Sequence, residues 1–216
     1  SRRQRQMCIR DRVTRTALIE ATGLSPAILT ALASKGIVNV FVREINRFRY
    51  IGTPSGTLPK LSEAQATALH EIHTGFLEKD VMLLHGVTSS GKTEIYIHLI
   101  DFVLKKGEQV LYLVPEIALT TQLTRRLQKV FGDKVIIYHS KFSDNERVDL
   151  WKRVLHDPSP CVVIGARSSL FLPFSKLGLV IVDEEHESSY KQYDPAPRYN
   201  ARDCAIVLAS MHGART

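Results

Sequence analysis

Long hydrophobic runs are absent from this 216-residue sequence, which contains no stretch approaching the roughly 20 apolar residues that cross a bilayer. The N-terminal residues are rich in arginine and contain no apolar signal segment, so we expect a cytoplasmic protein without a membrane partner. Cysteine is also scarce, because Cys8, Cys161 and Cys204 lie far apart and form neither a paired nor a metal-binding pattern. These absences argue against a membrane span, a disulfide framework and a zinc site in this sequence.

An excess of acidic charge is also missing. The net charge is +7, and it belongs to residues 1–50, since residues 51–216 contain equal numbers of basic and acidic side chains. A basic N-terminal quarter indicates a polyanionic partner. Residues 1–12 show no structural period, and their string QMCIRDR resembles translated adapter sequence from library preparation. We expect a disordered arm there, leave open whether it is native, and base no function on it.

Residues 13–50 predict the order helix, tight turn, helix, strand. The strings TRTALIEAT and PAILTALASK are typical of short helices, the second with Ser25 as its N-cap, Pro26 as its first residue and Gly36 after its end. Residues 37–47 alternate apolar and polar side chains as a strand does. This order favours a small winged-helix domain, although a helical protein-interaction module fits the same pattern.

Residues 51–60 are rich in Gly, Pro, Ser and Thr and predict a linker. From residue 61 to residue 216, short apolar strands alternate with amphipathic helices. That alternation is typical of an α/β domain with a parallel, doubly wound sheet, in which ligands bind at the carboxyl ends of the strands.

The sequence VMLLHGVTSSGKTE (residues 81–94) carries the strongest motif. Its spacing G-x-x-x-x-G-K-T, between an apolar run expected as a strand and a helical pattern, matches a phosphate-binding P-loop. The loop N–H groups and the positive end of the following helix would hold phosphate, Lys92 would reach the β- and γ-phosphates, and Thr93 would hold Mg²⁺. The predicted nucleotide-binding residues are Gly86, Val87, Thr88, Ser89, Ser90, Gly91, Lys92 and Thr93.

A second chemical signal is the acidic string DEEH, which directly follows the apolar strand LVIV. Asp183 at that strand end would complete the Mg²⁺ site begun by Thr93. Glu184 would orient and deprotonate the water that attacks the γ-phosphate. An acidic tetrapeptide alone is usually a solvated turn, but its place after a strand and downstream of a P-loop predicts an ATPase. Lys92, Asp183 and Glu184 are therefore the predicted catalytic residues.

Several further strings occur in a specific order, namely LVPEIALTTQL, YHS, IGARSSLF, DEEH and SYKQYDPAPRYNARDCA. Together with the P-loop they resemble superfamily 2 helicases, which have a RecA-like lobe, and within them the replication-restart helicase family of primosomal protein N′ (PriA). The resemblance covers roughly residues 14–216. It implies an ATP- and Mg²⁺-dependent 3′→5′ DNA helicase of the bacterial cytoplasm, associated with the nucleoid, that acts in primosome assembly at stalled forks.

The same resemblance implies roles for single residues. Gln65 would read adenine and His186 would couple hydrolysis to DNA movement. Residues 188–202 would form an aromatic-rich loop that senses single-stranded DNA, and its alternating aromatic and basic side chains suit base stacking and phosphate neutralisation. The implied DNA-binding residues are Thr120, Thr121, Arg167, Ser168, Tyr190, Lys191, Tyr193, Arg198, Tyr199 and Arg202. Tyr199, near the start of the last helix, is the tyrosine we most expect to pack instead.

Two departures from the family pattern qualify these expectations. Ser89 stands where the family usually has glycine, which matters if that position needs a positive φ. The sequence also stops within the first helicase lobe, before the second lobe, its arginine finger and the family's zinc-binding cysteines. We therefore expect zinc only in a downstream part, and we expect this chain alone to bind ATP weakly and not to unwind DNA.

By resemblance, the implied partners are single-stranded and forked DNA, primosome proteins and single-strand-binding protein. A superfamily 2 double-stranded DNA translocase, and a non-catalytic DNA- or partner-binding module, remain as alternatives. The presence of Lys92, Thr93, Asp183 and Glu184 argues against the module, because an inactive site has no chemical reason to retain all four.

Overall fold

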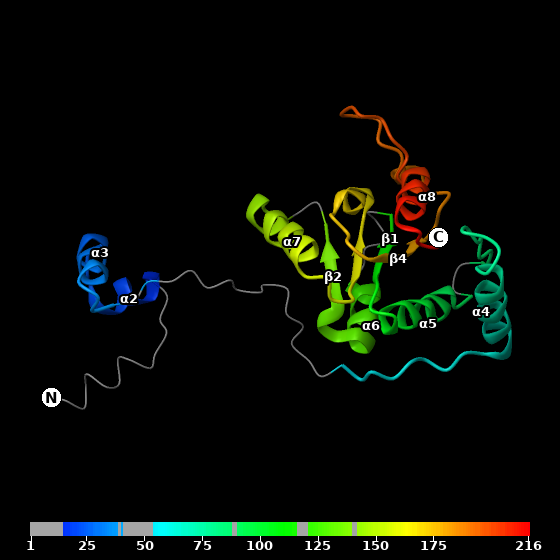
Figure 1. Cartoon of the computed structure of the whole chain (residues 1–216), viewed down its shortest axis with the longest axis horizontal. Coiled ribbons are helices and arrows are strands. Elements are labelled where there is room, and N and C mark those ends of the chain that lie inside the picture. The colour runs from blue at the N-terminus through cyan, green and yellow to red at the C-terminus, as the bar shows by residue number, and fades with distance from the viewer. Residues whose placement is uncertain (1–14, 39, 41–53, 88–89, 116–120, 140–141) are drawn as a thin grey trace. The chain divides into compact units, whose positions relative to one another are not determined.

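The computed structural model of the protein describes residues 15–38, 40, 54–87, 90–115, 121–139 and 142–216 (Figure 1). The chain forms two compact units, Ser1–Asn46 and Arg47–Thr216. In the part of the chain that is described, no helix has the length and apolar character needed to span a membrane. The larger unit carries the predicted P-loop and the acidic string.

The larger unit is built on a four-stranded sheet of β1 (Gln109–Leu113), β2 (Val135–Tyr138), β3 (Val162–Gly165) and β4 (Leu177–Val182). The strand order is β2-β3-β1-β4, and every pairing is parallel. Leu113 lies opposite both Gly165 and Val182, so β1, β3 and β4 end level with one another. The residues that follow these strands therefore emerge at one edge of the sheet, as the sequence predicts.

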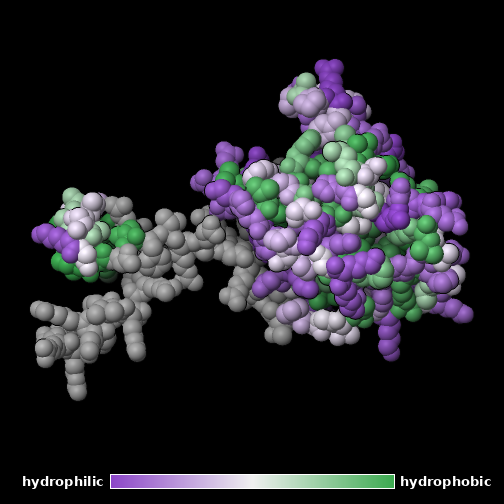
Figure 2. Space-filling view, in the orientation of Figure 1, coloured by the Kyte–Doolittle hydropathy of each residue, from purple (hydrophilic) through white to green (hydrophobic). Residues whose placement is uncertain are grey.

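Helices cover both faces of this sheet, which confirms the doubly wound α/β prediction. Val110 and Tyr112 of β1 belong to a core with α5 (Lys92–Lys105) and α6 (Thr121–Phe131). Leu111 and Leu113 point the opposite way, into a core with α7 (Asp144–His156) and α8 (Ala201–His212). Successive strand residues alternate between the faces, so this apolar strand is buried on both sides. The visible surface is mainly hydrophilic with smaller apolar areas (Figure 2).

Local sequence signals account for the helix ends. Ser62 caps α4 (Glu63–Gly75) and Ser143 caps α7, each in a capping box with Gln65 and Glu146 respectively. In this motif the serine hydroxyl accepts a hydrogen bond from the backbone N–H of the residue three positions later. The side chain of that residue in turn accepts a hydrogen bond from the backbone N–H of the serine. Residues 116–120, expected to begin the helix that forms α6, lie outside the described residues.

The apolar run at residues 81–84 differs from its prediction, because residues 81–87 form no strand. The carboxy-terminal residues instead lie next to β4, where Arg215 bridges Leu179. Met82 N–H then donates to Thr216 O at 2.9 Å, and Thr216 N–H donates to Asp80 O at 2.8 Å. The carboxy-terminal residues therefore lie between β4 and residues 81–84. Residues 81–84 form too few backbone hydrogen bonds there to make a strand. The Leu83 side chain is 75 % exposed.

The described part of the predicted linker, residues 54–60, contacts the rest of the larger unit. Ser55 N–H donates to Lys129 O at 2.8 Å, Leu58 packs against the core, and the His98 ring lies 2.9 Å from Pro59 O. Pro54 also lies against Gly132, so residues 54–60 pack along the rest of the larger unit, and the assignment of residues 51–60 as a domain linker stays a prediction.

In the smaller unit, α2 (Arg15–Thr22) and α3 (Pro26–Ser34) match the two predicted helices. Gly36 follows with φ 66°, a conformation that glycine adopts without strain. The predicted strand at residues 37–47 lies largely outside the described residues, so the structure does not show a winged helix.

Candidate nucleotide-binding site

The P-loop ends at Gly91, the N-cap of α5. Gly91 has φ 82°, and a Cβ there would overlap the Gln65 side-chain amide and come within 3.2 Å of Glu94 Oε2. Both the conformation and the crowding require glycine. At Gly86 a Cβ would lie 2.8 Å from Ser90 Oγ. Thr88 and Ser89 lie outside the described residues, so the effect of serine at position 89 stays a prediction.

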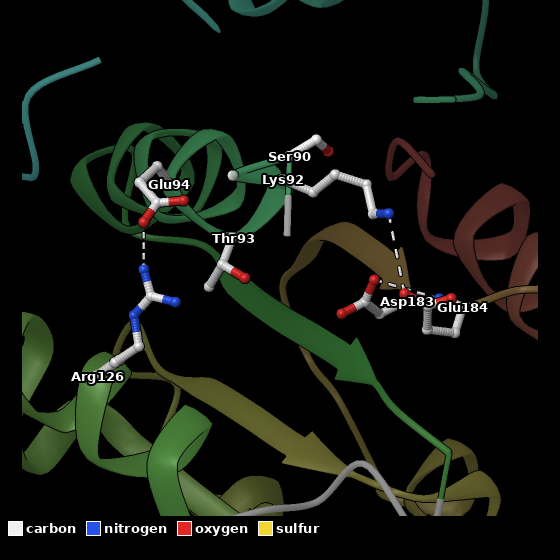
Figure 3. A pocket seen from close by; sticks show the side chains of 8 residues that line it. Ser90, Lys92, Thr93, Glu94, Arg126, Asp183 and Glu184 are labelled. Atoms are coloured by element: carbon white, nitrogen blue, oxygen red, sulfur yellow. Dashed lines mark hydrogen bonds and ion pairs between the residues drawn. The ribbon is translucent and has the colours of Figure 1, made fainter. Parts of the chain in front are cut away.

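Lys92 lies in the first turn of α5 and connects the loop to the acidic string. Its ammonium donates to Gly86 O at 2.7 Å and to Val87 O at 3.4 Å. The same Nζ lies 3.8 Å from Glu184 Oε1 (Figure 3). Tertiary folding therefore brings together two side chains that are 92 positions apart in the sequence.

One pocket contains Ser90, Gly91, Lys92 and Thr93 of the predicted P-loop together with the predicted metal and water-activating residues. It is lined by Ser90, Gly91, Lys92, Thr93, Glu94, Arg126, Asp183 and Glu184. In Figure 3 the Thr93 hydroxyl points toward the side of the pocket that holds Asp183 and Glu184. A hydroxyl and one carboxylate suit Mg²⁺, which commonly takes one or two protein oxygens and completes its shell with phosphate and water. No cluster of three or more His, Cys, Asp or Glu residues able to hold a metal occurs among the described residues.

Asp183 is held in place by Tyr112, which the sequence analysis did not identify, and by Tyr190, which it assigned to DNA binding. Buried Tyr112 donates its hydroxyl to Asp183 Oδ2 at 3.0 Å, and Glu184 N–H donates to Oδ1 at 3.2 Å. Tyr190 donates to the Asp183 backbone oxygen at 2.6 Å. Burial raises the pKa of Asp183, and the ionised neighbour Glu184 raises it further, while the Tyr112 hydrogen bond opposes that shift.

Glu184 and His186 turn away from β4 at the pocket margin. Glu184 has φ 48°, a left-handed conformation that is uncommon outside glycine and that occurs preferentially at functional sites. His186 Nε2 lies 3.8 Å from Glu184 Oε2, and its side chain is 70 % exposed. Arg202, from the first turn of α8, pairs with Glu185 at 2.9 Å and so connects the acidic string to that helix.

Gln65 reaches the P-loop from α4. Its Oε1 accepts the Ser62 N–H at 2.8 Å as part of the capping box, and its Nε2 donates to Gly91 O at 3.1 Å. The side-chain amide is therefore fixed beside Gly91, which lines the pocket, and its contact with adenine stays a prediction.

Comparison with known proteins agrees with this geometry. The DEAD/DEAH box helicase family matches residues 62–210, the segment that contains the pocket. The chain belongs to the DEAD/DEAH box helicase family.

Within this helicase family the chain is a homologue of replication restart protein PriA. It is 42 % identical to that protein of Bacillus subtilis (strain 168) over 201 residues, or 90 % of this chain and 24 % of the relative. It is 44 % identical to the Haemophilus influenzae protein over 195 residues, or 86 % of this chain and 26 % of the relative. For the Rickettsia typhi protein the identity is 50 % over 151 residues, or 69 % of this chain and 22 % of the relative. The chain thus spans about a quarter of the length of the curated relatives it matches.

Among solved structures, a nuclease-deletion mutant of the Type ISP restriction-modification enzyme LlaGI in complex with a DNA substrate mimic is similar, with a TM-score of 0.49. The identity is 22 %, over 61 % of this chain and 16 % of the other. This likeness is too low to support an argument about function.

Residues 188–202, the aromatic-rich loop after the acidic string, are partly buried. Tyr190 is 1 % exposed, so its ring cannot stack on a base in this arrangement. Arg167 donates to Lys191 O at 3.0 Å and to Ser189 O at 3.4 Å, and so fastens this segment to the loop after β3. Half-buried Tyr199 meets Phe171 edge to face at 5.3 Å. These side chains are positioned to hold the loop.

Other side chains predicted to bind DNA are more accessible. Tyr193 is 67 % exposed, and Arg198 is also exposed. Lys191 Nζ donates to Arg198 O at 3.3 Å, across the loop. Thr121 is exposed at the start of α6 and Ser168 is half-buried, while Thr120 lies outside the described residues.

Sequence reasoning missed Tyr112, Glu94 and Arg126 in the pocket region. Tyr112 belongs to an apolar strand, and Glu94 and Arg126 belong to amphipathic helices, where such residues are ordinary. No motif in the sequence distinguished them.

Proposed function

We propose that this chain is the ATP-binding part of a DNA helicase that moves 3′→5′ and restarts replication at stalled forks. The observation that carries the proposal is the approach of Lys92 to Glu184, 3.8 Å apart in a pocket that also contains Thr93 and Asp183. This set supplies a phosphate-directed lysine, two oxygen ligands suited to Mg²⁺ and a carboxylate able to activate water, which are side-chain roles that water attack on a γ-phosphate uses.

Each group has a separate task in that chemistry. Lys92 would exchange the Gly86 carbonyl for β- and γ-phosphate oxygens, offsetting charge as the terminal P–O bond breaks. Thr93 and Asp183 would hold Mg²⁺, which when bound neutralises charge on the same phosphates. Glu184 would orient a water molecule and accept its proton, and His186 would sense the change at Glu184 from 3.8 Å away.

Single-stranded and forked DNA are the proposed nucleic-acid partners, with primosome proteins and single-strand-binding protein as proposed protein partners. The similarity to proteins named for replication restart supports this assignment. The exposed Tyr193 and Arg198 suit contact with bases and phosphates. Tyr190 connects the same loop to Asp183, which gives DNA contact a route to the pocket.

The first test is ATP binding by the purified chain beside Lys92→Ala. We expect measurable affinity in the wild type and a loss of about tenfold or more in the variant, because Lys92 is the cation that the P-loop directs at the β- and γ-phosphates. Equal affinities in two folded proteins would refute the proposed site.

The second test addresses DNA unwinding in a full-length context. The matching quarter of Bacillus subtilis PriA would be replaced by this chain, with the parent protein assayed in parallel. We expect ATP-dependent strand displacement from a partial duplex with a 3′ tail, and none from the Lys92→Ala chimaera. If the parent unwinds the substrate and the folded chimaera does not, or if a 5′ tail is preferred, the helicase proposal fails.

A further inference from the structure

The pocket contains a cation that neither the P-loop motif nor the acidic string accounts for. Arg126, on α6, forms an ion pair with Glu94, the residue that follows Thr93 on α5. Both side chains line the pocket, and Figure 3 shows the Arg126 guanidinium beside Glu94 on the opposite side of Thr93 from Lys92 and Glu184. The Arg126 side chain is 43 % exposed, so a ligand can reach it.

The two ends of this pocket suit different parts of a nucleotide. Lys92 and Glu184 mark the end at which a γ-phosphate would react. Glu94 lies at the other end, where its second oxygen, Oε2, comes within 3.2 Å of the position of a Gly91 Cβ, beside the Gln65 amide. Arg126 and Glu94 therefore line the end that would receive the α-phosphate and the nucleoside, and Gln65 lies next to it through its contact with Gly91.

A purely structural role does not account well for this ion pair. Partly exposed ion pairs contribute only about 0–1 kcal/mol to stability. Helix α6 is already fixed to the sheet by Leu127 and Phe131, both buried in the core. An arginine held by a carboxylate at the margin of a polar pocket is, in contrast, well arranged to meet phosphate oxygens, which its planar fork can bind at two points.

We propose that Arg126 is a nucleotide-binding residue that contacts the α-phosphate, and that it exchanges its ion pair with Glu94 for that contact when the nucleotide arrives. The inference rests on the proposed function, because it assumes that this pocket binds ATP. It adds a phosphate contact from α6 to those of the P-loop.

Titration of ATP and ADP into the purified chain and its variants tests the proposal. We expect Arg126→Ala to weaken both nucleotides by about tenfold and to the same extent, since both contain the α-phosphate. Arg126→Lys keeps the charge but loses the fork, so its affinities should lie between those of the wild type and Arg126→Ala. The neighbouring Arg125→Ala, also on α6 but not lining the pocket, is the matched control and should bind as the wild type does.

The Glu94→Gln variant separates a phosphate contact from a structural ion pair. Removing that carboxylate frees Arg126 and removes an anion from the site, so nucleotide affinity should be kept or increased. A structural ion pair predicts the opposite, with Glu94→Gln and Arg126→Ala weakening binding equally.

Lys92→Ala distinguishes this inference from the proposed function. If Lys92→Ala loses ATP binding but folded Arg126→Ala and Arg126→Lys do not, the Arg126 proposal is wrong and the ATP site stands. A decrease in ATP affinity alone, with ADP unchanged, would also overturn it, because that pattern indicates a γ-phosphate contact. If Lys92→Ala binds ATP normally, both proposals fail.

Discussion

Replacing Tyr112 with phenylalanine would test whether the hydroxyl behind the pocket supports Asp183, the carboxylate that we propose to bind Mg²⁺. Tyr112 is fully buried, and its hydroxyl donates to Asp183 Oδ2 at 3.0 Å. Phenylalanine keeps the ring and its edge-to-face contact with Tyr96, whose ring centre is 5.7 Å away. The substitution therefore removes one hydrogen bond to a carboxylate and little else.

The expected loss of stability follows from that single bond. A hydrogen bond to a charged group contributes about 1.5–3 kcal/mol, and the hydroxyl no longer has to be buried, so we expect a net loss of about 1–2 kcal/mol. For a chain of this size, that loss lowers the midpoint of thermal unfolding by roughly 3–6 °C. Because the hydroxyl also orients Asp183, the Mg²⁺ concentration needed for half-maximal ATP binding should rise by about tenfold.

The pH dependence of this loss has a defined sign. Burial holds the pKa of Asp183 above its usual range, and the Tyr112 hydrogen bond opposes that shift by favouring the ionised form. The variant should therefore lose most stability at pH values above the pKa of Asp183 in the fold. The difference from wild type should shrink as the pH falls through that pKa and the carboxyl becomes protonated.

Thermal unfolding across a pH series and Mg²⁺ titrations of ATP binding would measure both effects. Tyr193→Phe is the matched control, because it removes a hydroxyl from a ring that is 67 % exposed, and it should leave stability unchanged. A loss that is equal at acidic and neutral pH, or an unchanged Mg²⁺ requirement, would refute the assigned role of Tyr112.

Three further substitutions address the reaction, the loop and a distant helix cap. Glu184→Gln should keep ATP binding but reduce hydrolysis by about 10²–10⁴-fold in the DNA-stimulated chimaera, because it removes the general base. Phosphate release measures this loss, and unchanged turnover would exclude that role. Gly91→Ala should lower the free energy of unfolding by about 1–2 kcal/mol and weaken ATP binding, since the φ of Gly91 is 82° and a Cβ would displace Gln65. An ATP affinity equal to that of the wild type would contradict this. Ser143→Ala should cost about 1 kcal/mol through the lost α7 cap without changing ATP affinity, and urea unfolding beside nucleotide titration checks both.

The sequence was most informative where the determining interactions are local. The capping boxes at Ser62 and Ser143 act over three residues, so the starts of α4 and α7 could be predicted. The P-loop spacing likewise specifies its own backbone path, since Gly91 adopts the left-handed conformation that the motif requires. Apolar strands between helices predicted a parallel sheet, because only burial on both faces explains such runs.

Prediction failed where a feature depends on contacts distant in the sequence. Residues 81–84 have a strand-like composition, but a strand also needs neighbouring backbone partners, and Thr216 supplies the hydrogen bonds at this position. The family resemblance implied that residues 188–202 contact DNA, and their aromatic and basic composition suits that role. Composition does not show which rings point inward, and the structure buries Tyr190 beneath Asp183 while leaving Tyr193 exposed.

The sequence by itself determined the α/β class, the P-loop and the carboxylates that belong with it, because these depend on short motifs and on the order of strands and helices. Only the tertiary structure decided which side chains support and complete the pocket. Tyr112 reaches Asp183 from β1, and Arg126 reaches Glu94 from α6, at separations of 71 and 32 residues. The first pair forms because β1 and β4 are adjacent and end level at one edge of the sheet, and the second because α5 and α6 pack into the same core, two long-range arrangements that no local pattern encodes.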